Sequence, residues 1–470
     1  MKNVFKTLLL TLSSFFLSLG IYAQTVNGTV VSDDGPLPGA TVQVKNTDRG
    51  TSTDFDGNYS IEASSGDILV ISFVGFATQE IAVGNQDQIN VTLVADSELE
   101  EIIVTGYRSQ ARGSVTGSVA TVDVADAIKV PVSNAAEALQ GRVAGLTVIN
   151  SGQPGSAPIV RIRGYSTPNN NDPLYVIDGV QTTDAYVLNS INPNDIQSIS
   201  VLKDGAASIY GARASNGVIL ITTKSGKGVE GTKVTIDLSY GMQTATNLPT
   251  LLTAKEHGDM LWQSYANDGV APDHVQYGNG STAVIPKNIR GITNDKILIV
   301  PPEGTDWFDA IFDPAPVSDI NISVASGSED SNFLFSLNHL KKEGIMIETA
   351  YERFGIRLNS DFNIHDNITI GQTLNVTTDV ENNPGSYTQQ AMRMSPLLPL
   401  RATDGTFSGI YVTSNNLGNV TSPYASLKRS SDDYAKSVRA IAGVYAQIDL
   451  TDDIYVKTSF NGQFRTFMNR

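Results

Sequence analysis

The stretch INPNDIQSISVLKDGAASIYGARASNGVILITTKSG, residues 191–226, is the most specific sequence in this chain of 470 residues. It alternates short β-rich runs with turns, and the preceding LQGRVAGLTVINSGQPGSAPIVRIRGYSTPNNNDPLYVIDGV, residues 139–180, does the same. A helix is expected over residues 133–139, because Ser133 is a good N-cap and Gly141 a good stop. Small residues such as Gly205 and Gly211 allow the backbone to approach neighbouring segments closely. Residues 113–228 are therefore predicted to form a mixed α/β domain.

Several motifs of this domain occur in the same order as in a known protein family. The pieces LQGRVAGL, RIRG and PLYVIDGV, followed by residues 191–226, resemble the plug domain of TonB-dependent receptors, and the SusC/RagA branch in particular. The resemblance covers essentially all of residues 113–228, the segment named the plug below. It implies active import across the outer membrane, powered by TonB and assisted by a SusD-like surface lipoprotein. No cofactor and no catalysis are implied.

Six charged residues in this compact domain are candidate plug-site residues. Inside a barrel they are expected to face charges on the wall across a wet, weak interface, which lets the plug shift when it is pulled. Ordinary solvated or locally paired side chains are the alternative. The six are Arg161, Arg163, Asp178, Lys203, Asp204 and Arg213.

A linker over residues 96–112 precedes the plug and contains one compact β-branched run. Six mostly acidic residues, 96–101, separate this run from the preceding domain. A strand-prone segment in polar surroundings suits β-augmentation, in which backbone hydrogen bonds to another protein's sheet supply the affinity. The alternative is a last strand of the preceding domain. By resemblance the run is the TonB box, the partner-binding segment made of Ile102, Ile103, Val104, Thr105, Gly106 and Tyr107.

Residues 24–95 read as a β-sandwich, because short β-rich runs alternate with turn clusters. The run GTVVSDDGPLPGATVQVKNTDRGTSTDFDGNYSI, residues 28–61, resembles a carboxypeptidase-regulatory-like domain. A zinc peptidase needs clustered His and Glu ligands. The four histidines lie elsewhere, without a partner at ligand spacing, so no metal site is expected. The cluster at Asp54 and Asp56 resembles a Ca²⁺ loop, but a hairpin turn is the better interpretation because the downstream Glu is missing.

The first 23 residues read as a secretory signal peptide, with Lys2 and Lys6 before a short apolar core. The chain has no cysteine, so disulfides and lipoprotein acylation are excluded. A net charge of −16 makes nucleic acid an unsuitable partner. The resemblance places the exported protein in the outer membrane, in contact with its lipid.

From residue 229 to residue 470 the sequence alternates apolar and polar residues. Short connections alternate with long ones, at 244–317 and 380–437, as in outer-membrane barrels with short periplasmic turns and long outer loops. Each strand is expected to have about 9–11 residues. The chain is thus predicted to continue as part of an antiparallel transmembrane β-barrel. Seven strands are predicted, at 232–243, 320–325, 331–340, 354–359, 368–377, 444–450 and 454–463.

Seven strands do not close around a plug, since plugged transporters use roughly 22. A longer protein, or a truncated gene, is therefore expected. The resemblance implies an oligosaccharide or a peptide as substrate. The alternatives are a siderophore or cobalamin receptor, a surface adhesin that needs no TonB box, and an enzyme, for which no nucleophile or metal cluster is found. Four loop aromatics are candidates for stacking on sugars, or else for packing: Trp262, Tyr265, Trp307 and Tyr387.

Overall fold

The computed structural model describes residues 24–32, 35–45, 47, 49–73, 76–84, 86–94, 102–105, 108–111, 117–122, 124–129, 132–229, 231–290, 297–409, 417, 421–451 and 454–470. The predicted signal peptide, the acidic residues 96–101, and Gly106 and Tyr107 lie outside these residues. The chain forms two compact units that divide between residues 103 and 116. Each unit is described by itself.

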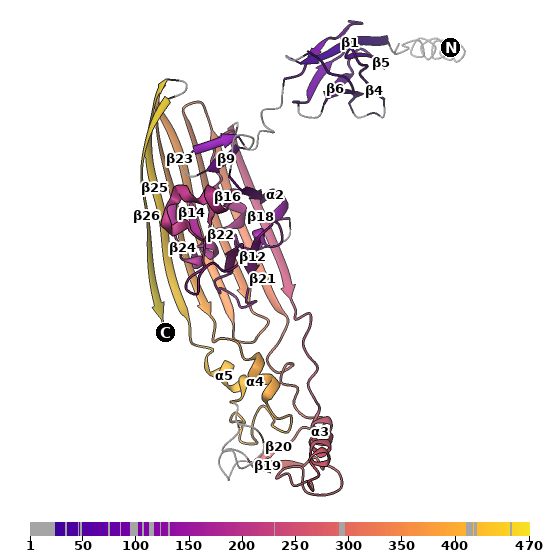
Figure 1. The fold of residues 1–470 in the computed structure, drawn as a ribbon, viewed down its shortest axis with the longest axis vertical. Helices are drawn as coiled ribbons and strands as arrows, with labels where there is room; N and C mark the ends of the chain where they lie inside the picture. Colours follow the sequence, from indigo (N-terminus) through magenta and orange to yellow (C-terminus); the bar gives the residue numbers. More distant parts are fainter. Residues whose placement is uncertain are drawn as a thin grey trace, which may run out of the picture. The chain divides into compact units, whose positions relative to one another are not determined.

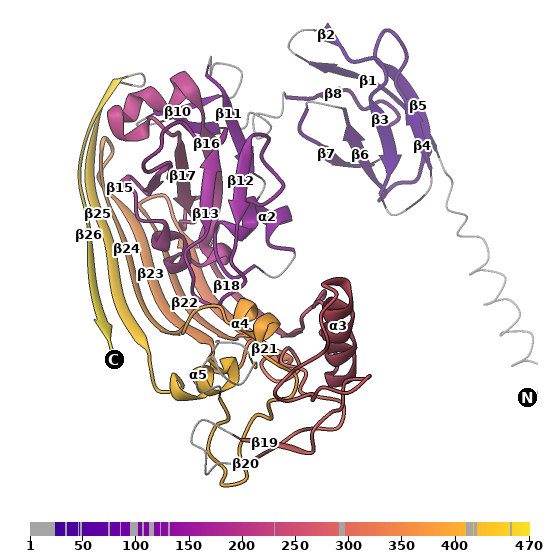
Figure 2. The ribbon, with the colours of Figure 1, turned by 60° about the horizontal axis from the view of Figure 1, so that its bottom comes forward.

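The first unit contains two four-stranded sheets around one apolar core (Figure 2). Alternate residues are buried in β3 and β5, as a two-layer sandwich requires. The sequence pattern does not reveal β2, β4 and β7, because two to four residues are too few to show alternation. One sheet contains β1 (Gln24–Ser32), β2 (Gly35–Pro36), β5 (Asn58–Ala63) and β8 (Val91–Thr92). The other contains β3 (Thr41–Val44), β4 (Gly50–Ser52), β6 (Ile68–Ser72) and β7 (Gln79–Ala82).

The Asp54 cluster is a turn between β4 and β5. The Oδ1 atom of Asp54 accepts hydrogen bonds from the backbone N–H groups of Asp56, at 3.0 Å, and Asn58, at 2.8 Å. These bonds, led by the one from Asn58, hold the pKa of Asp54 below its usual value. The Asp54 carboxylate therefore stabilises the turn by accepting hydrogen bonds from its backbone.

The segment predicted to bind TonB contains a strand. Strand β9 (Ile102–Thr105) pairs with β10 (Arg108–Ala111) in a separate two-stranded sheet.

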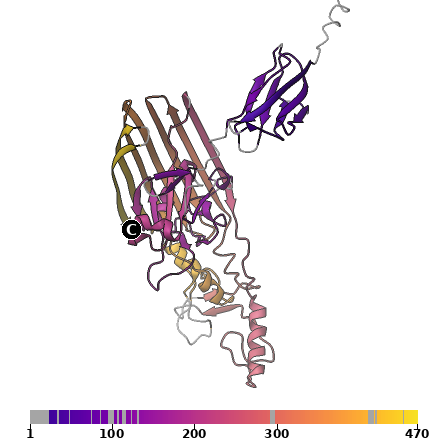
Figure 3. The ribbon, with the colours of Figure 1, turned by 45° about the horizontal axis from the view of Figure 1, so that its top comes forward.

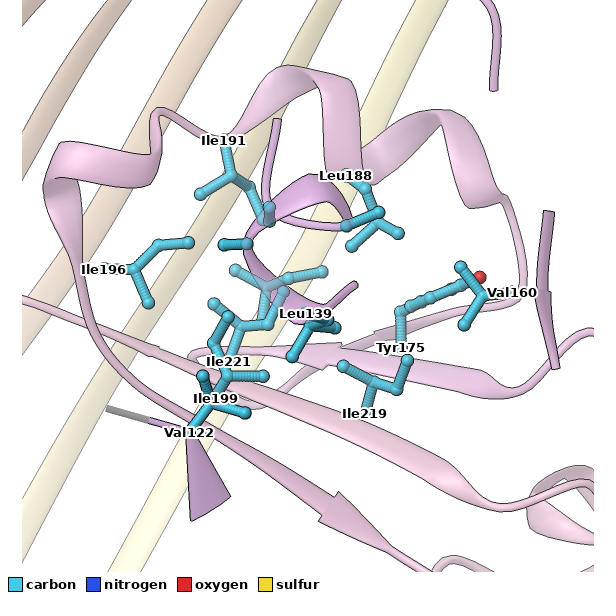
Figure 4. Packing of buried hydrophobic residues seen from close by; sticks show 14 of the residues in the cluster. Val122, Leu139, Val160, Tyr175, Leu188, Ile191, Ile196, Ile199, Ile219 and Ile221 are labelled. Atoms are coloured by element: carbon cyan, nitrogen blue, oxygen red, sulfur yellow. The ribbon is translucent and has the colours of Figure 1, made fainter. Parts of the chain in front are cut away.

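The plug is built on a five-stranded sheet in the order β11–β16–β17–β14–β15. Its apolar core lies beneath 3₁₀ turns on one side of that sheet, as Figure 4 shows for Leu188, Ile191 and Ile199. A separate antiparallel pair, β12–β13, packs onto the same core. The strands are β11 (Val119–Val122), β12 (Leu146–Ile149), β13 (Ile159–Ile162), β14 (Leu174–Ile177), β15 (Val180–Thr182), β16 (Ile196–Leu202) and β17 (Val218–Thr223). The helical segments are α2 (Val124–Ala127), η3 (Glu137–Leu139), η4 (Ala185–Ser190), η5 (Pro193–Asp195), η6 (Asp204–Tyr210) and η7 (Ala212–Ala214).

The helix expected over residues 133–139 is wrong in extent, because only the single turn η3 forms. Asn134 Oδ1 accepts from the backbone N–H groups of Ala136 and Glu137, both at 3.0 Å. The Glu137 carboxylate accepts from the backbone N–H of Ser133 at 2.6 Å. Such local bonds from side chains to the backbone compete with a regular helix.

Seven long antiparallel strands form one sheet, called the wall below, which lies behind the plug (Figures 1 and 3). Each strand pairs with the next in chain order, so all seven predicted strands are present. They have 13–17 residues, more than the 9–11 expected, because the sheet continues past the span estimated for a bilayer crossing. The strands are β18 (Gly231–Gln243), β21 (Ala315–Gly327), β22 (Ser331–Glu343), β23 (Ala350–His365), β24 (Ile368–Asn382), β25 (Ala435–Thr451) and β26 (Ile454–Asn469).

The two long connections of the wall fold together at one end of it (Figure 1). The described residues within 244–314 and 383–434, called the loop module below, have their own apolar core around Trp307, Phe308 and Leu397. Within the described residues, no helix is long and apolar enough to span a membrane. The module contains α3 (Ala254–Asn267), β19 (Asn288–Arg290), β20 (Ile297–Ile299), α4 (Thr388–Arg393) and α5 (Pro423–Arg429).

Candidate functional site: the interface between plug and wall

The wall strands have their polar face inside and their apolar face outside. On β23, Arg353 and Arg357 are buried against the plug, at 1% and 2% exposure, whereas the intervening Phe354 and Ile356 are 43% and 36% exposed. The same reversal occurs on β21, where Asn321 is buried between the exposed Ile320 and Ile322. A water-soluble sandwich shows the opposite pattern, whereas a membrane barrel with a polar lumen shows this one.

The wall holds the first end of η4 through one carboxylate. Asp184 is the N-cap of η4, and its Oδ1 atom accepts from the backbone N–H of Tyr186 at 3.0 Å. Its Oδ2 atom accepts from Arg439 on β25, at 2.7 Å, and from Arg465 on β26, at 3.1 Å. Asp184 thus joins one helix start to two wall strands.

The wall also holds the other end of η4. The last carbonyl groups of a helix lack partners within the helix and need donors from elsewhere. Arg353 donates to the Asn189 carbonyl at 2.7 Å. Asn375 and Thr377 on β24 donate to the Ser190 carbonyl, at 3.2 Å and 3.0 Å. Wall side chains therefore supply the C-terminal cap of this plug helix.

A second anchor lies where β14 and β17 end. Arg357 donates to Asp178 Oδ2 at 3.1 Å and to Thr223 Oγ1 at 2.9 Å. Asp178 in turn accepts from the backbone N–H and the hydroxyl of Thr223. Asn359 continues the anchor by donating to Thr223 Oγ1 and to the Lys224 carbonyl.

Asp195 adds a buried carboxylate beside this second anchor. Its Oδ2 atom is 4.0 Å from Arg357 Nε, and the residue is 5% exposed. Burial raises the pKa of Asp195, and the positive charge of Arg357 opposes that shift. One arginine therefore faces two carboxylates in a dry part of the interface, where an unpaired charge is costly.

Asp178 is one of the six predicted plug charges, and it contacts the wall. Its contact is buried rather than wet, since the Arg357 side chain is 3% exposed. Among the described residues, the contacts of the other five lie within the plug. They join Arg161 to Asp172, Arg163 to Asp204, Lys203 to the Ala144 carbonyl, and Arg213 to Gln181.

Sequence reasoning missed Asp184, Asn189, Ser190 and Arg353. Arg353 directly precedes the strand predicted from Phe354, and the carbonyl acceptors of Asn189 and Ser190 have no sequence signature. The one available signal was the alternation of apolar and polar residues along a strand, because Arg357 and Asn375 fall at polar positions of their predicted strands.

A cavity of about 920 Å³ opens between plug and wall beside η4. Tyr186 and Asn189 of the plug line it, as do Asp379 and Glu381 of β24 and Arg439 of β25. It lies at the end of the wall where β24 leaves for the loop module and β25 returns from it. A concave site with mixed charge and aromatic side chains suits a polar ligand.

The loop aromatics serve as packing anchors. Trp307 is 1% exposed, and its indole N–H donates to the Ser395 carbonyl at 3.1 Å. The indole of Trp262 donates to the Gly280 carbonyl, and the Tyr265 hydroxyl donates to the Asp273 carbonyl. Tyr387 packs at the edge of the same apolar core.

Two family models match this chain. Residues 111–218 match the TonB-dependent Receptor Plug Domain, and residues 26–104 match the CarboxypepD_reg-like domain. Together they cover the sandwich, residues 102–104 of β9 and most of the plug.

Curated relatives and solved structures extend the match into the wall. "TonB-dependent receptor P26" of Formosa agariphila is 38% identical over 400 residues, which is 84% of this chain and 38% of the relative. "TonB-dependent receptor SusC" of Bacteroides thetaiotaomicron is 37% identical over 369 residues, 76% of this chain and 34% of the relative. The RagAB peptide importer in its open-open state aligns with a TM-score of 0.61 at 27% identity, over 78% of this chain and 42% of that one. The chain thus spans less than half the length of these relatives.

Proposed function

Because this chain belongs to the SusC-like TonB-dependent receptors, we propose that it supplies the plug and the first wall strands of an importer in the outer membrane. The polar inner face and apolar outer face of the wall support this proposal most directly. They give each strand one side suited to lipid and one suited to an enclosed, polar domain.

The cavity beside η4 is the proposed place of ligand contact. Its lining combines carboxylates, arginines and tyrosines, which suit the hydroxyl groups of an oligosaccharide. A peptide is the second candidate, because the neighbouring RagAB structure is that of a peptide importer. A SusD-like surface lipoprotein is the proposed partner at the loop module.

TonB is the proposed partner at residues 102–107. Strand β9 has paired one of its edges with β10, and a strand in a two-stranded sheet has a second edge for an incoming strand. Pulling through this segment acts on a plug that polar contacts hold to the wall.

Deletion of residues 102–107 from the full-length receptor tests the proposal in cells that lack the native gene. We expect uptake of a labelled oligosaccharide to fall to background, with the receptor still at the cell surface. Deletion of residues 96–101 is the matched control, because it shortens the linker equally and leaves the strand in place. Unchanged uptake after loss of residues 102–107 would contradict import driven through this segment, and binding of the oligosaccharide without any receptor-dependent uptake would favour the adhesin.

The same strains, grown with oligosaccharide, peptide or ferric siderophore as the sole source of carbon, nitrogen or iron, separate the substrate classes. We expect dependence on the receptor with the oligosaccharide. Dependence with the peptide alone would transfer the proposal to peptide import.

A further inference from the structure

Two plug carboxyl groups at the second anchor face one buried arginine, and they are held differently. Asp178 accepts hydrogen bonds from Arg357 at 3.1 Å, and from the backbone N–H and the hydroxyl of Thr223 at 2.9 Å and 2.8 Å. Asp195 Oδ2 lies 4.0 Å from Arg357 Nε, beyond hydrogen-bond distance, and the Asp195 side chain is 6% exposed. Donors therefore solvate a negative charge on Asp178, whereas Asp195 faces a cation that Asp178 already engages.

The hydrogen bonds beside Asp195 begin at the first end of η5. Asn192 is the N-cap of η5, and its Oδ1 atom accepts from the backbone N–H of Asn194 at 3.1 Å. Its Nδ2 atom therefore faces the wall and donates to Asn321 Oδ1 of β21 at 2.7 Å. This bond fixes the orientation of the Asn321 amide, because only its oxygen can accept. Asn321 Nδ2 accordingly donates to Asp237 of β18 at 3.2 Å.

The orientation of Asn321 sets the direction of the hydrogen bonds at Ser336 of β22. Ser336 Oγ lies 3.1 Å from Asn321 Oδ1, and a hydroxyl beside an amide oxygen must donate to it. A serine hydroxyl has one proton, so towards its other hydrogen-bond neighbour, the carboxyl of Asp195, it can only accept. A carboxylic acid, which donates, satisfies this contact, whereas a carboxylate only accepts.

The charges around Asp195 agree with a protonated carboxyl. Burial raises the pKa of Asp195, and three nearby cations oppose that shift. The three are Arg357 and Arg353 of β23 and Lys224, which follows β17. Asp178 bonds directly to Arg357, so that arginine does not serve Asp195 alone. Asp237 lies at the far end of the same network and is joined to it through the neutral amide of Asn321.

We propose that Asp195 binds a proton when the plug docks against the wall and releases it when water reaches η5. Attachment of the plug is then coupled to the pH of the surrounding water. The docked plug holds one proton more than the separated plug. Docking is therefore strongest below the ordinary pKa of 3.8, and this contribution is lost as the pH rises through the raised pKa of Asp195. The inference goes beyond the proposed function, since it needs neither TonB nor a substrate.

Hydrogen exchange in the purified full-length receptor tests the proposal through its pH dependence. Residues 193–196 and 223–224 are the reporters, because the Lys224 N–H donates to the Asp195 carbonyl at 2.8 Å. After correction for the intrinsic exchange rate, the opening constant of these residues is expected to rise between about pH 5 and pH 8. One proton allows a rise of at most about tenfold per pH unit.

Three variants separate the proton from the rest of the interface. Asp195→Asn imitates the protonated acid, because the amide keeps a donor for Ser336, and it should retain wild-type protection at pH 5 and lose the pH dependence. Ser336→Ala removes the acceptor of the acid and should weaken protection more at pH 5 than at pH 8. Asp237→Asn is the matched control, because it removes an exposed carboxylate of the same network. It should keep the wild-type pH dependence.

Infrared spectroscopy gives a readout that is independent of exchange. At about pH 5, where an ordinary aspartate is ionised, the difference between wild type and Asp195→Asn should contain a carboxylic acid C=O band that fades as the pH rises. Absence of this band would overturn the proposal, as would exchange in the wild type that does not depend on pH. A pH dependence that persists in Asp195→Asn would overturn it as well. A receptor that imports nothing but shows both signals would refute the proposed function alone.

Discussion

The plug and the loop module are both joined to the wall, but they are held in different ways. Arginine, asparagine and threonine side chains that reach carbonyl and carboxylate oxygens hold the plug. The loop module is continuous with the ends of the wall strands, and its own apolar core around Trp307 holds it together. Hydrogen bonds break one at a time and can be replaced by water, whereas an apolar core resists opening as a unit. The part proposed to move thus has the reversible attachment.

Trp307→Ala should produce the largest effect, because it truncates a buried side chain of the apolar core of the loop module. Truncating a wholly buried tryptophan costs about 3–5 kcal/mol, and the Ser395 carbonyl also loses its donor. Hydrogen exchange in the full-length receptor should show loss of protection at residues 395–398, with the plug unaffected. Trp262→Ala is the control and should cost less, because Trp262 is only partly buried. Equal effects of the two changes would contradict a core centred on Trp307.

Asp178→Asn should produce an intermediate effect, because it weakens the polar contact between the plug and Arg357 of the wall. The change keeps an acceptor for Thr223 but removes the charge that faces Arg357. Hydrogen bonds to charged groups contribute about 1.5–3 kcal/mol, and we expect a loss of that order in the local opening free energy of residues 218–224. Asp172→Asn, at the more exposed pair with Arg161, is the control and should cost under about 1 kcal/mol. A larger loss at Asp172 would argue against the anchor at Arg357.

His257→Gln should have the smallest effect, visible only as a change in pH dependence. Burial lowers the pKa of His257 below its ordinary value of 6.5, and the nearby His274 lowers it further. The unfolded module therefore binds more protons than the folded one as the pH falls below about 6.5, and acid destabilises it. Protection of residues 254–278 should fall between pH 7.5 and pH 5.5 in the wild type and fall less in His257→Gln. The exposed His365→Gln should retain the wild-type slope.

The sequence predicted the seven wall strands because apolar and polar residues alternate along each of them and short connections alternate with long ones. It predicted the plug by resemblance, and the chemistry of single residues there did not identify the interface. Asp178 was selected for its charge together with five residues whose contacts lie within the plug. The acceptors that matter most at η4 are the backbone carbonyls of Asn189 and Ser190, which every residue type has. Which wall donor faces which carbonyl depends on tertiary packing, and no local pattern records it.

Asp184 has a consequence for the order in which the protein assembles. The two arginines that it accepts from, Arg439 and Arg465, stand directly opposite each other on β25 and β26. Like charges at such a cross-strand pair oppose the pairing of the two strands. Asp379 on the neighbouring strand β24 attracts both arginines, and the carboxylate of Asp184 offsets the remaining repulsion once the plug is in position. Strand β26 therefore adds to β25 most readily on a sheet that has taken up its plug, so the plug acts as a template on which the growing sheet is extended.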